Sequence, residues 1–180
     1  MASALVLLPE GFEELEAIAP IDVLRRGGVD VVVAALGPCL LVTGRCQVTL
    51  RADLLLESVP PDRTFDLLLL PGGPGVKHLR ADARVRSLVL AQHASQRWIG
   101  AICAAPTVLG DVGLLHGKRY TCHPSVASEL PERLAHERVV IDGRLVTSRG
   151  AGTALDFGLA LVGILISPAK RDEVAQAICV

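Results

Sequence analysis

Short, almost wholly apolar runs, rich in Val, Leu and Ile, are the feature that most constrains the fold of this chain. Segments with helical spacing of apolar residues separate these runs. A strand that is apolar on both faces is typical of a parallel sheet covered by helices on both sides. The pattern therefore predicts an α/β fold. The buried strands are expected at 4–8, 29–35, 65–70 and 98–102.

Helices and hairpins fill the space between these strands. Helices are expected at 13–27, 82–97, 152–166 and 169–178, with another starting near Pro106. Pro20 should kink or split the first helix. Residues 40–42 and 47–50 are expected to form a hairpin that is appended to the sheet. Asp142-Gly143 is expected to form the turn of a second hairpin. With 180 residues and no repeat or linker, we expect a single domain covering residues 1–180.

Composition excludes several classes of protein. Hydrophobic residues make up 51% of the chain, which is too many for a disordered protein. The net charge is -1 and aromatic residues are only 3%, so no nucleic-acid partner is expected. The longest apolar run, 157–166, is shorter than the ~20 residues of a membrane-spanning helix, so no membrane partner is expected either.

The N-terminus and the cysteines predict the compartment. The first apolar stretch has no basic residues before it and is cut short at Pro9, so we expect no secretory signal. The five cysteines are an odd number without regular spacing. Free thiols in a reducing cytoplasm are therefore expected.

Three apolar strands run directly into residues that can carry chemistry. Leu8 is followed by Pro9, Leu70 by the Pro71-Gly72-Gly73 turn, and Ile102 by Cys103. Ligands of open parallel sheets bind beyond the carboxyl ends of the strands. The functional site is therefore expected where these three segments end.

Cys103 is the strongest candidate for a reactive residue. It lies between a buried strand and a helix that starts at once, which is the geometry of a nucleophile elbow. A helix N-terminus lowers a thiol pKa and offers N–H groups to an oxyanion. The alternative is a buried cysteine that only fills space. The position after a strand favours the functional interpretation.

Three further positions carry candidates with open alternatives. Glu16 either complements the helix dipole, as Glu13 and Glu14 do, or faces inward with a raised pKa. His123, which is expected to follow a short strand, is either a pocket residue or a histidine that only makes hydrogen bonds. The Gly72-Gly73 pair either presents N–H groups to a ligand or simply makes a tight turn. No metal-ligand spacing and no complete nucleotide-binding motif occurs, so no metal or cofactor is expected.

Four motifs follow one another along nearly the whole chain: LVLLPEGFEELE at 5–16, LLPGG at 69–73, AICAAPT at 101–107 and LVTSRGAGT at 145–153. Together these motifs resemble the ThiJ/PfpI superfamily, and most of all its DJ-1 branch. The resemblance implies a flavodoxin-like three-layer sandwich, with helices on both faces of the sheet, and a homodimer.

The resemblance also assigns roles to residues. It places the nucleophile at Cys103, the carboxyl group at Glu16 and the pocket histidine at His123. The N–H groups of Gly73 and Ala104 would form the oxyanion site. In the family, the cysteine oxidises readily to a sulfinate, which a hydrogen bond from the protonated glutamate stabilises.

Reactive carbonyl compounds are the substrates that the resemblance implies. The expected reaction is glutathione-independent conversion of methylglyoxal or glyoxal to hydroxy acids, with deglycation as a related activity. Arg26 and Arg45 are expected to bring positive charge to the rim of the pocket. Two positions depart from the family pattern, because Ala151 replaces a common proline and Cys46 replaces an anion-binding arginine.

Two other functions remain open at this point. The same thiol would serve a non-enzymatic redox sensor or chaperone that acts through oxidation of Cys103. A cysteine peptidase of the PfpI type is the more distant alternative. Those peptidases carry a histidine directly after the cysteine, whereas Ala104 follows Cys103 here.

Overall fold

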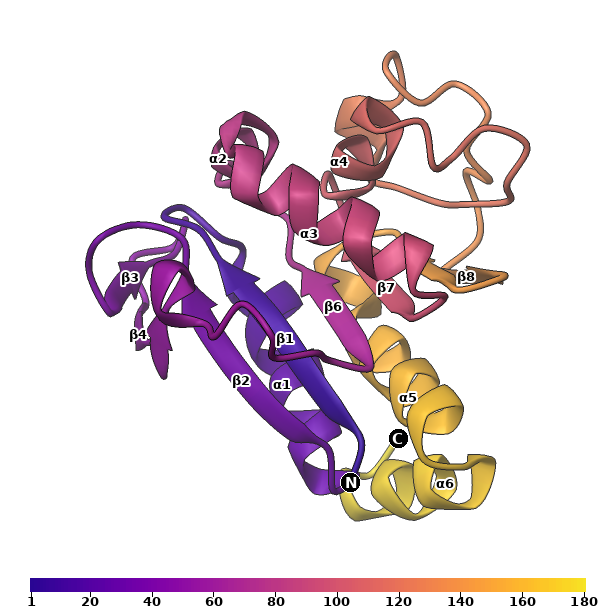
Figure 1. The fold of residues 1–180 in the computed structure, drawn as a ribbon. Coiled ribbons are helices and arrows are strands. Elements are labelled where there is room, and N and C mark those ends of the chain that lie inside the picture. Colours follow the sequence, from indigo (N-terminus) through magenta and orange to yellow (C-terminus); the bar gives the residue numbers. More distant parts are fainter.

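A seven-stranded sheet forms the centre of the computed structural model, which describes residues 1–180 (Figure 1). The strand order is β5-β2-β1-β6-β7-β9-β8, and only the edge strand β8 runs antiparallel to its neighbour. The strands of this sheet are β1 (Ser3–Leu8), β2 (Asp30–Ala35), β5 (Leu54–Leu55), β6 (Leu67–Leu70), β7 (Trp98–Ile102), β8 (Val139–Asp142) and β9 (Leu145–Ser148).

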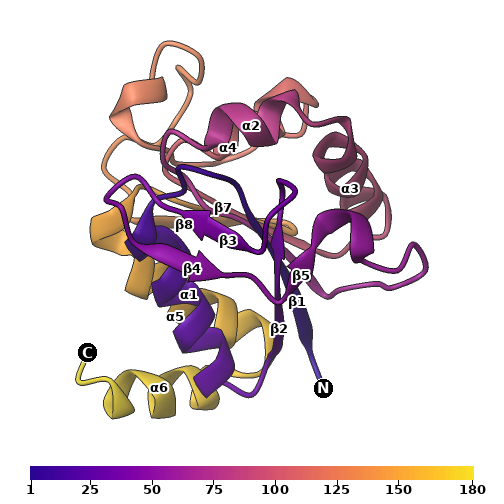
Figure 2. The ribbon, with the colours of Figure 1, turned by 90° about the vertical axis from the view of Figure 1, so that its left-hand side faces the viewer.

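Helices cover both faces of the sheet, so two hydrophobic cores form (Figure 2). On one face lie α1 (Glu14–Arg26), α5 (Ala154–Leu165) and α6 (Pro168–Ala177). On the other lie α2 (Val76–Ala81), α3 (Ala83–Ala94) and α4 (Pro106–Asp111). Three short 3₁₀ turns complete the chain: η1 (Leu56–Ser58), η2 (Pro124–Val126) and η3 (Ala151–Thr153). The predicted flavodoxin-like three-layer architecture is confirmed.

Helix α1 continues through Pro20, so the predicted split at this residue is wrong. Pro20 is buried where α1 crosses α5 at Gly158. A methyl group on Gly158 would lie 3.2 Å from the Pro20 Cα and 3.1 Å from the Val23 Cβ. Tight packing between the two helices therefore outweighs the hydrogen bond that a proline removes from a helix interior.

The hairpin after β2 is a separate sheet rather than an extension of the main one. Strands β3 (Leu41–Thr43) and β4 (Thr49–Arg51) pair only with each other. Their anchor is the start of α1, since the Arg45 N–H donates to the Phe12 carbonyl at 2.8 Å. The expected appended hairpin is thus corrected to one attached through the loop that leads into α1.

Two short elements and one loop also differ from the sequence analysis. Helix α2 and strand β5 were not expected, and both are too short to show a clear period in the sequence. The segment before His123 was expected to be a strand but is irregular. A side chain holds this segment against the sheet, because the Thr147 hydroxyl accepts the Thr121 N–H at 3.0 Å.

The sheet topology brings the ends of β1, β6 and β7 together. Leu5 in β1 pairs with Val32 of β2 on one side and with Leu68 of β6 on the other. The chain connections reverse direction between β1 and β6, and a crevice at such a switch point is where doubly wound sheets bind ligands. None of the helices combines the length and the apolar character needed to cross a membrane.

Candidate active site

Cys103 stands in a strained elbow between β7 and the turn that leads into α4. Its φ is +64°, a left-handed conformation that is unusual for a residue with a side chain. Two backbone hydrogen bonds hold it there. Its N–H donates to the Ser148 carbonyl at 2.9 Å, and its own carbonyl accepts the His123 N–H at 2.8 Å. The nucleophile-elbow geometry expected from the sequence is therefore present.

Glu16 lies in the first turn of α1 and faces the interior. The residue is only 1% exposed, and its Oε2 atom has no hydrogen-bond partner. Glu13 caps the helix, because its carboxylate accepts the Glu16 N–H at 2.8 Å. The Glu13 N–H donates to the Gly72 carbonyl at 3.0 Å, which fixes this turn against the end of β6. Of the two interpretations of Glu16, the structure supports the inward-facing one.

The two glycines after β6 allow Glu16 and Cys103 to approach each other. A methyl group on Gly72 would lie 2.5 Å from the Cys103 Cβ and would also overlap the Glu16 Oε2 atom. Gly73 has a φ of +91°, and a side chain there would collide with the backbone at Gly11 and Glu13. Glycine is therefore required at both positions, for close approach at one and for conformation at the other.

Burial and proximity set the proton affinities of this pair. Burial raises the pKa of Glu16 to about 7, although a hydrogen bond with Cys103 opposes the rise. Burial also raises the pKa of the Cys103 thiol to about 12, and the Glu16 carboxylate adds to this effect. The N–H groups of Gly73 and Ala104 act in the opposite direction on the sulfur. The expectation of a lowered thiol pKa is corrected, because burial and the Glu16 carboxylate outweigh these two N–H groups.

His123 lies beside the carboxyl group, with Gly150 between them. A methyl group on Gly150 would lie 3.3 Å from the His123 Cδ2 and 3.8 Å from the Glu16 Oε1. The His123 Nδ1 accepts the Ser125 N–H at 3.1 Å. In the neutral ring the proton therefore sits on Nε2. The exposed imidazole is positioned at the mouth of the site rather than inside it.

The loop after β9 closes the other side of the site. The Ser148 hydroxyl lies 2.7 Å from the Thr153 hydroxyl, and the Thr153 hydroxyl accepts the Gly150 N–H at 3.1 Å. This network fixes Ala151, whose N–H lowers the pKa of Glu16. The roles of Ser148 and Thr153 could not be predicted from their types alone, although both belong to the motif at 145–153.

The two arginines expected at the rim occupy different places. Arg26 lies in the last turn of α1, about 15 Å along the helix axis from Glu16, and pairs with Asp22 at 2.8 Å. Within one chain, the structure does not bring Arg26 to Cys103. Arg45 lies at the exposed tip of the β3–β4 hairpin, next to the start of α1.

Glu14, predicted only to complement the helix dipole, has a structural role. Its Oε1 accepts the Cys46 N–H at 2.7 Å and the Val48 N–H at 3.4 Å, which ties the hairpin to α1. Burial acts to raise the pKa of Glu14, but hydrogen bonds from backbone N–H groups outweigh it and lower that pKa. No group of three or more His, Cys, Asp or Glu side chains is placed to hold a metal ion.

Comparison with known proteins agrees with this geometry. A model of the DJ-1/PfpI family matches residues 2–163. The chain belongs to this family. The "Glutathione-independent glyoxalase DJR-1.2" of Caenorhabditis elegans is 39% identical over 186 residues, covering 98% of this chain and 96% of that protein. The resemblance to the DJ-1 branch is confirmed, and this DJ-1/PfpI member has a relative that is named as a glyoxalase.

Solved DJ-1 structures match the whole fold of this DJ-1/PfpI chain. The structure named "Toxoplasma gondii DJ-1, oxidized" has a TM-score of 0.94 and 32% identity, and the match covers 99% of this chain and 98% of that one. The "Protein DJ-1 homolog B" of Arabidopsis thaliana is 40% identical over 176 residues. That match covers 96% of this chain but only 40% of the Arabidopsis protein, so this chain spans well under half the length of that relative.

Proposed function

We propose that this protein converts small 2-oxoaldehydes, such as methylglyoxal and glyoxal, to 2-hydroxy acids without glutathione. The observation that carries the proposal is the pair formed by Cys103 and Glu16. A nucleophile in a strained elbow faces a carboxyl group whose pKa, raised by burial, lies near 7. A proton-transfer group works best when its pKa lies near the working pH. The glyoxalase name of the nematode relative supports the same reaction class.

The first step adds the thiol of Cys103 to the aldehyde. The Glu16 carboxylate takes the thiol proton as the new S–C bond forms, so the high pKa of the resting thiol does not block attack. The N–H groups of Gly73 and Ala104 face the reacting sulfur and stabilise the alkoxide that develops next to it. Glu16 then returns the proton to this oxygen, which gives a neutral hemithioacetal.

The second step moves hydrogen between the two substrate carbons. Glu16 removes the proton from the former aldehyde carbon, and an enediol forms while the ketone oxygen is protonated through His123 or water. Glu16 then returns its proton to the second carbon. The first oxygen loses its proton, which leaves a thioester of the 2-hydroxy acid. Water cleaves the C–S bond, releases the hydroxy acid and restores the thiol, so no external oxidant or reductant is consumed.

The decisive experiment measures lactate formed from methylglyoxal in the absence of glutathione. Wild type should complete many turnovers, whereas Cys103→Ser and Glu16→Gln should each lose at least about 100-fold in kcat/KM, as expected for a nucleophile and a general base. Cys39→Ser is the matched control, because Cys39 is an exposed free cysteine. Equal activity of the wild type and the two site variants would overturn the proposal. A glycated peptide assayed in parallel tests deglycation.

A redox sensor is the second candidate function. The observation that favours it is the Glu16 Oε2 atom, which is buried beside Cys103 without a hydrogen-bond partner. A protonated Glu16 would donate from this atom to a sulfinate on Cys103. One solved DJ-1 neighbour is named as oxidized. Mass spectrometry after peroxide treatment should find Cys103 modified before Cys39. Retention of a fully reduced Cys103 would exclude the sensor function.

We further propose a homodimer in the cytoplasm. Exposed apolar side chains on α1 support self-association, since Leu15 is 58% and Ile18 is 38% exposed. All five cysteines are free, which suits a reducing compartment. Sedimentation analysis tests the dimer, and Leu15→Glu should shift it toward monomer. A monomeric wild type at micromolar concentration would contradict the dimer.

A further inference from the structure

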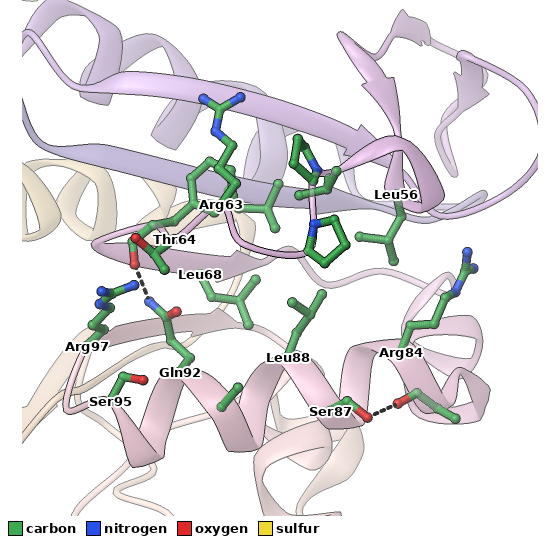
Figure 3. Close-up of a pocket in the computed structure, with 17 residues that line it drawn as sticks. Leu56, Arg63, Thr64, Leu68, Arg84, Ser87, Leu88, Gln92, Ser95 and Arg97 are labelled. Atoms are coloured by element: carbon green, nitrogen blue, oxygen red, sulfur yellow. Dashed lines mark hydrogen bonds between the residues drawn. The ribbon is translucent and has the colours of Figure 1, made fainter.

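The connection between β5 and β6 lacks an α-helix, and this leaves a groove on the face opposite α1. Parallel strands are usually joined through a helix that covers the sheet. Here only the turn η1 and the loop 59–66 cross between the two strands. Helix α3 packs over β6 and β7 on the same face. A cavity of about 600 Å³ remains between this loop and α3, within the usual size range of ligand sites (Figure 3).

The floor and walls of this groove are apolar. Leu5 and Leu68, which are paired neighbours in β1 and β6, line its floor and are almost fully buried. Leu56 lies on the loop side and Leu88 on α3, facing each other across the cavity (Figure 3). Ala91 of α3, which has a small side chain, also lines the groove. The groove therefore suits the apolar body of a ligand.

The charged residues at the rim of the groove are all arginines, and the lining contains no carboxylate. Two of them are already paired. Arg63 forms an ion pair with Asp30 at 3.3 Å and covers the Phe65 ring. Arg84 is held by Asp82 and donates to the Leu36 carbonyl at 3.0 Å.

Arg97, at the end of the groove beyond α3, makes no hydrogen bond or ion pair through its side chain and is only partly exposed (Figure 3). The hydroxyls of Thr64 and Ser95 lie at the same end and also make no hydrogen bond to the protein. Gln92 is fixed there, since its amide donates to the Phe65 and Trp98 carbonyls at 3.0 and 3.1 Å. One unpaired cation and two free hydroxyl donors at one end of an apolar groove form a receptor for a single anionic group.

We propose that the groove binds an amphipathic anion, with its carboxylate at Arg97 and its apolar chain over Leu68 and Leu88. This inference does not rest on the proposed function, because none of the groove residues belongs to the Cys103 site. The ligand class is a monomeric single-chain carboxylate of fatty-acid type.

Binding is tested with the anionic probe 1-anilinonaphthalene-8-sulfonate. Trp98 is the single tryptophan and directly follows Arg97, so it is a close energy-transfer donor for probe bound at this end of the groove. We expect saturable transfer that dodecanoate, below its micellar concentration, abolishes and dodecyltrimethylammonium does not. Equal displacement by the cationic amphiphile, or the absence of saturable transfer, would overturn the proposal.

Variants separate the groove from general surface charge. Arg97→Gln and Arg97→Glu should each weaken dodecanoate binding about tenfold or more, because a charge-assisted hydrogen bond is lost. Ala91→Phe should weaken it by filling the groove. Arg86→Glu is the matched control, because Arg86 is exposed on α3 and does not line the groove. Cys103→Ser should bind like wild type. An effect of Arg86→Glu as large as that of Arg97→Glu would refute the assignment.

Discussion

Replacing Glu16 by Gln should stabilise the protein in a pH-dependent way. Glu16 is 1% exposed, and burial raises the pKa of its carboxyl from 4.5 to about 7. A carboxyl group whose pKa is raised in the folded state favours folding below its unfolded pKa of 4.5. This contribution is lost as the pH rises from 4.5 through about 7. Once ionised, the group should cost the folded state about 3 kcal/mol, at about 1.4 kcal/mol per pH unit.

The assay is urea unfolding at pH 5.5 and pH 8.0 in reducing buffer. Both proteins should also carry Cys103→Ser, so that the sulfur neither titrates nor oxidises while a hydroxyl remains beside residue 16. The advantage of Glu16→Gln in unfolding free energy should grow by about 2 kcal/mol between the two pH values. That change is large against a typical domain stability of about 5–15 kcal/mol.

Glu137→Gln provides the control, since Glu137 is exposed and its side chain makes no hydrogen bond or ion pair. The difference in unfolding free energy between Glu137→Gln and its parent should not grow comparably between the two pH values. A constant difference between Glu16→Gln and its parent at the two pH values would refute the argument. The buried carboxyl would then be ionised throughout, and its role as a proton-transfer group at neutral pH would lose its basis.

Two further predictions concern the framework of the site. Gly72→Ala should lose about 1–3 kcal/mol of unfolding free energy through overpacking, and the Cys103 thiol should become less reactive. Gly37→Ala is the control and should be nearly neutral, because no atom lies within 4 Å of a methyl group placed there. Thermal unfolding compares the two variants. Glu14→Ala should release the β3–β4 hairpin and speed hydrogen exchange at the amides of Cys46 and Val48, which donate to this carboxylate. The free energy of unfolding of the wild type should approach that of the variant as the pH falls through the lowered Glu14 pKa. Unchanged hydrogen exchange at the two amides in Glu14→Ala would contradict the proposed anchoring of the hairpin by Glu14.

The main strands of the fold could be predicted from the sequence because each is a continuous apolar run. The run at 65–70 needs only its composition to identify it as a buried parallel strand. Strand β5 has two residues and helix α2 has six, so neither shows a period. The helix break predicted at Pro20 was wrong for a different reason, because the local preference of proline is outweighed by a tertiary contact with Gly158 that the sequence does not reveal.

Positions in the site were easier to predict than their energetics. Cys103, Gly72 and Glu16 follow from strand ends and motifs, and the structure places all three in contact around one point. The predicted lowering of the Cys103 thiol pKa was wrong, because this pKa depends on how deeply the sulfur is buried and on its distance to Glu16. The role of Glu14 was missed since it depends on hairpin N–H groups that are distant in the sequence.

The shared proton links the two candidate functions of this site. A neutral carboxyl and an ionised carboxylate at Glu16 have opposite effects on the sulfur beside it, so the proposed catalysis requires Glu16 to alternate between them near its pKa of about 7. A sulfinate on Cys103 would be a permanent anion, and its charge would raise the Glu16 pKa further. Oxidation would therefore both remove the nucleophile and hold the proton on Glu16. If both proposals hold, one molecule cannot turn over carbonyl substrates while Cys103 is a sulfinate. Peroxide should therefore oxidise Cys103 in proportion to the carbonyl-converting activity that is lost.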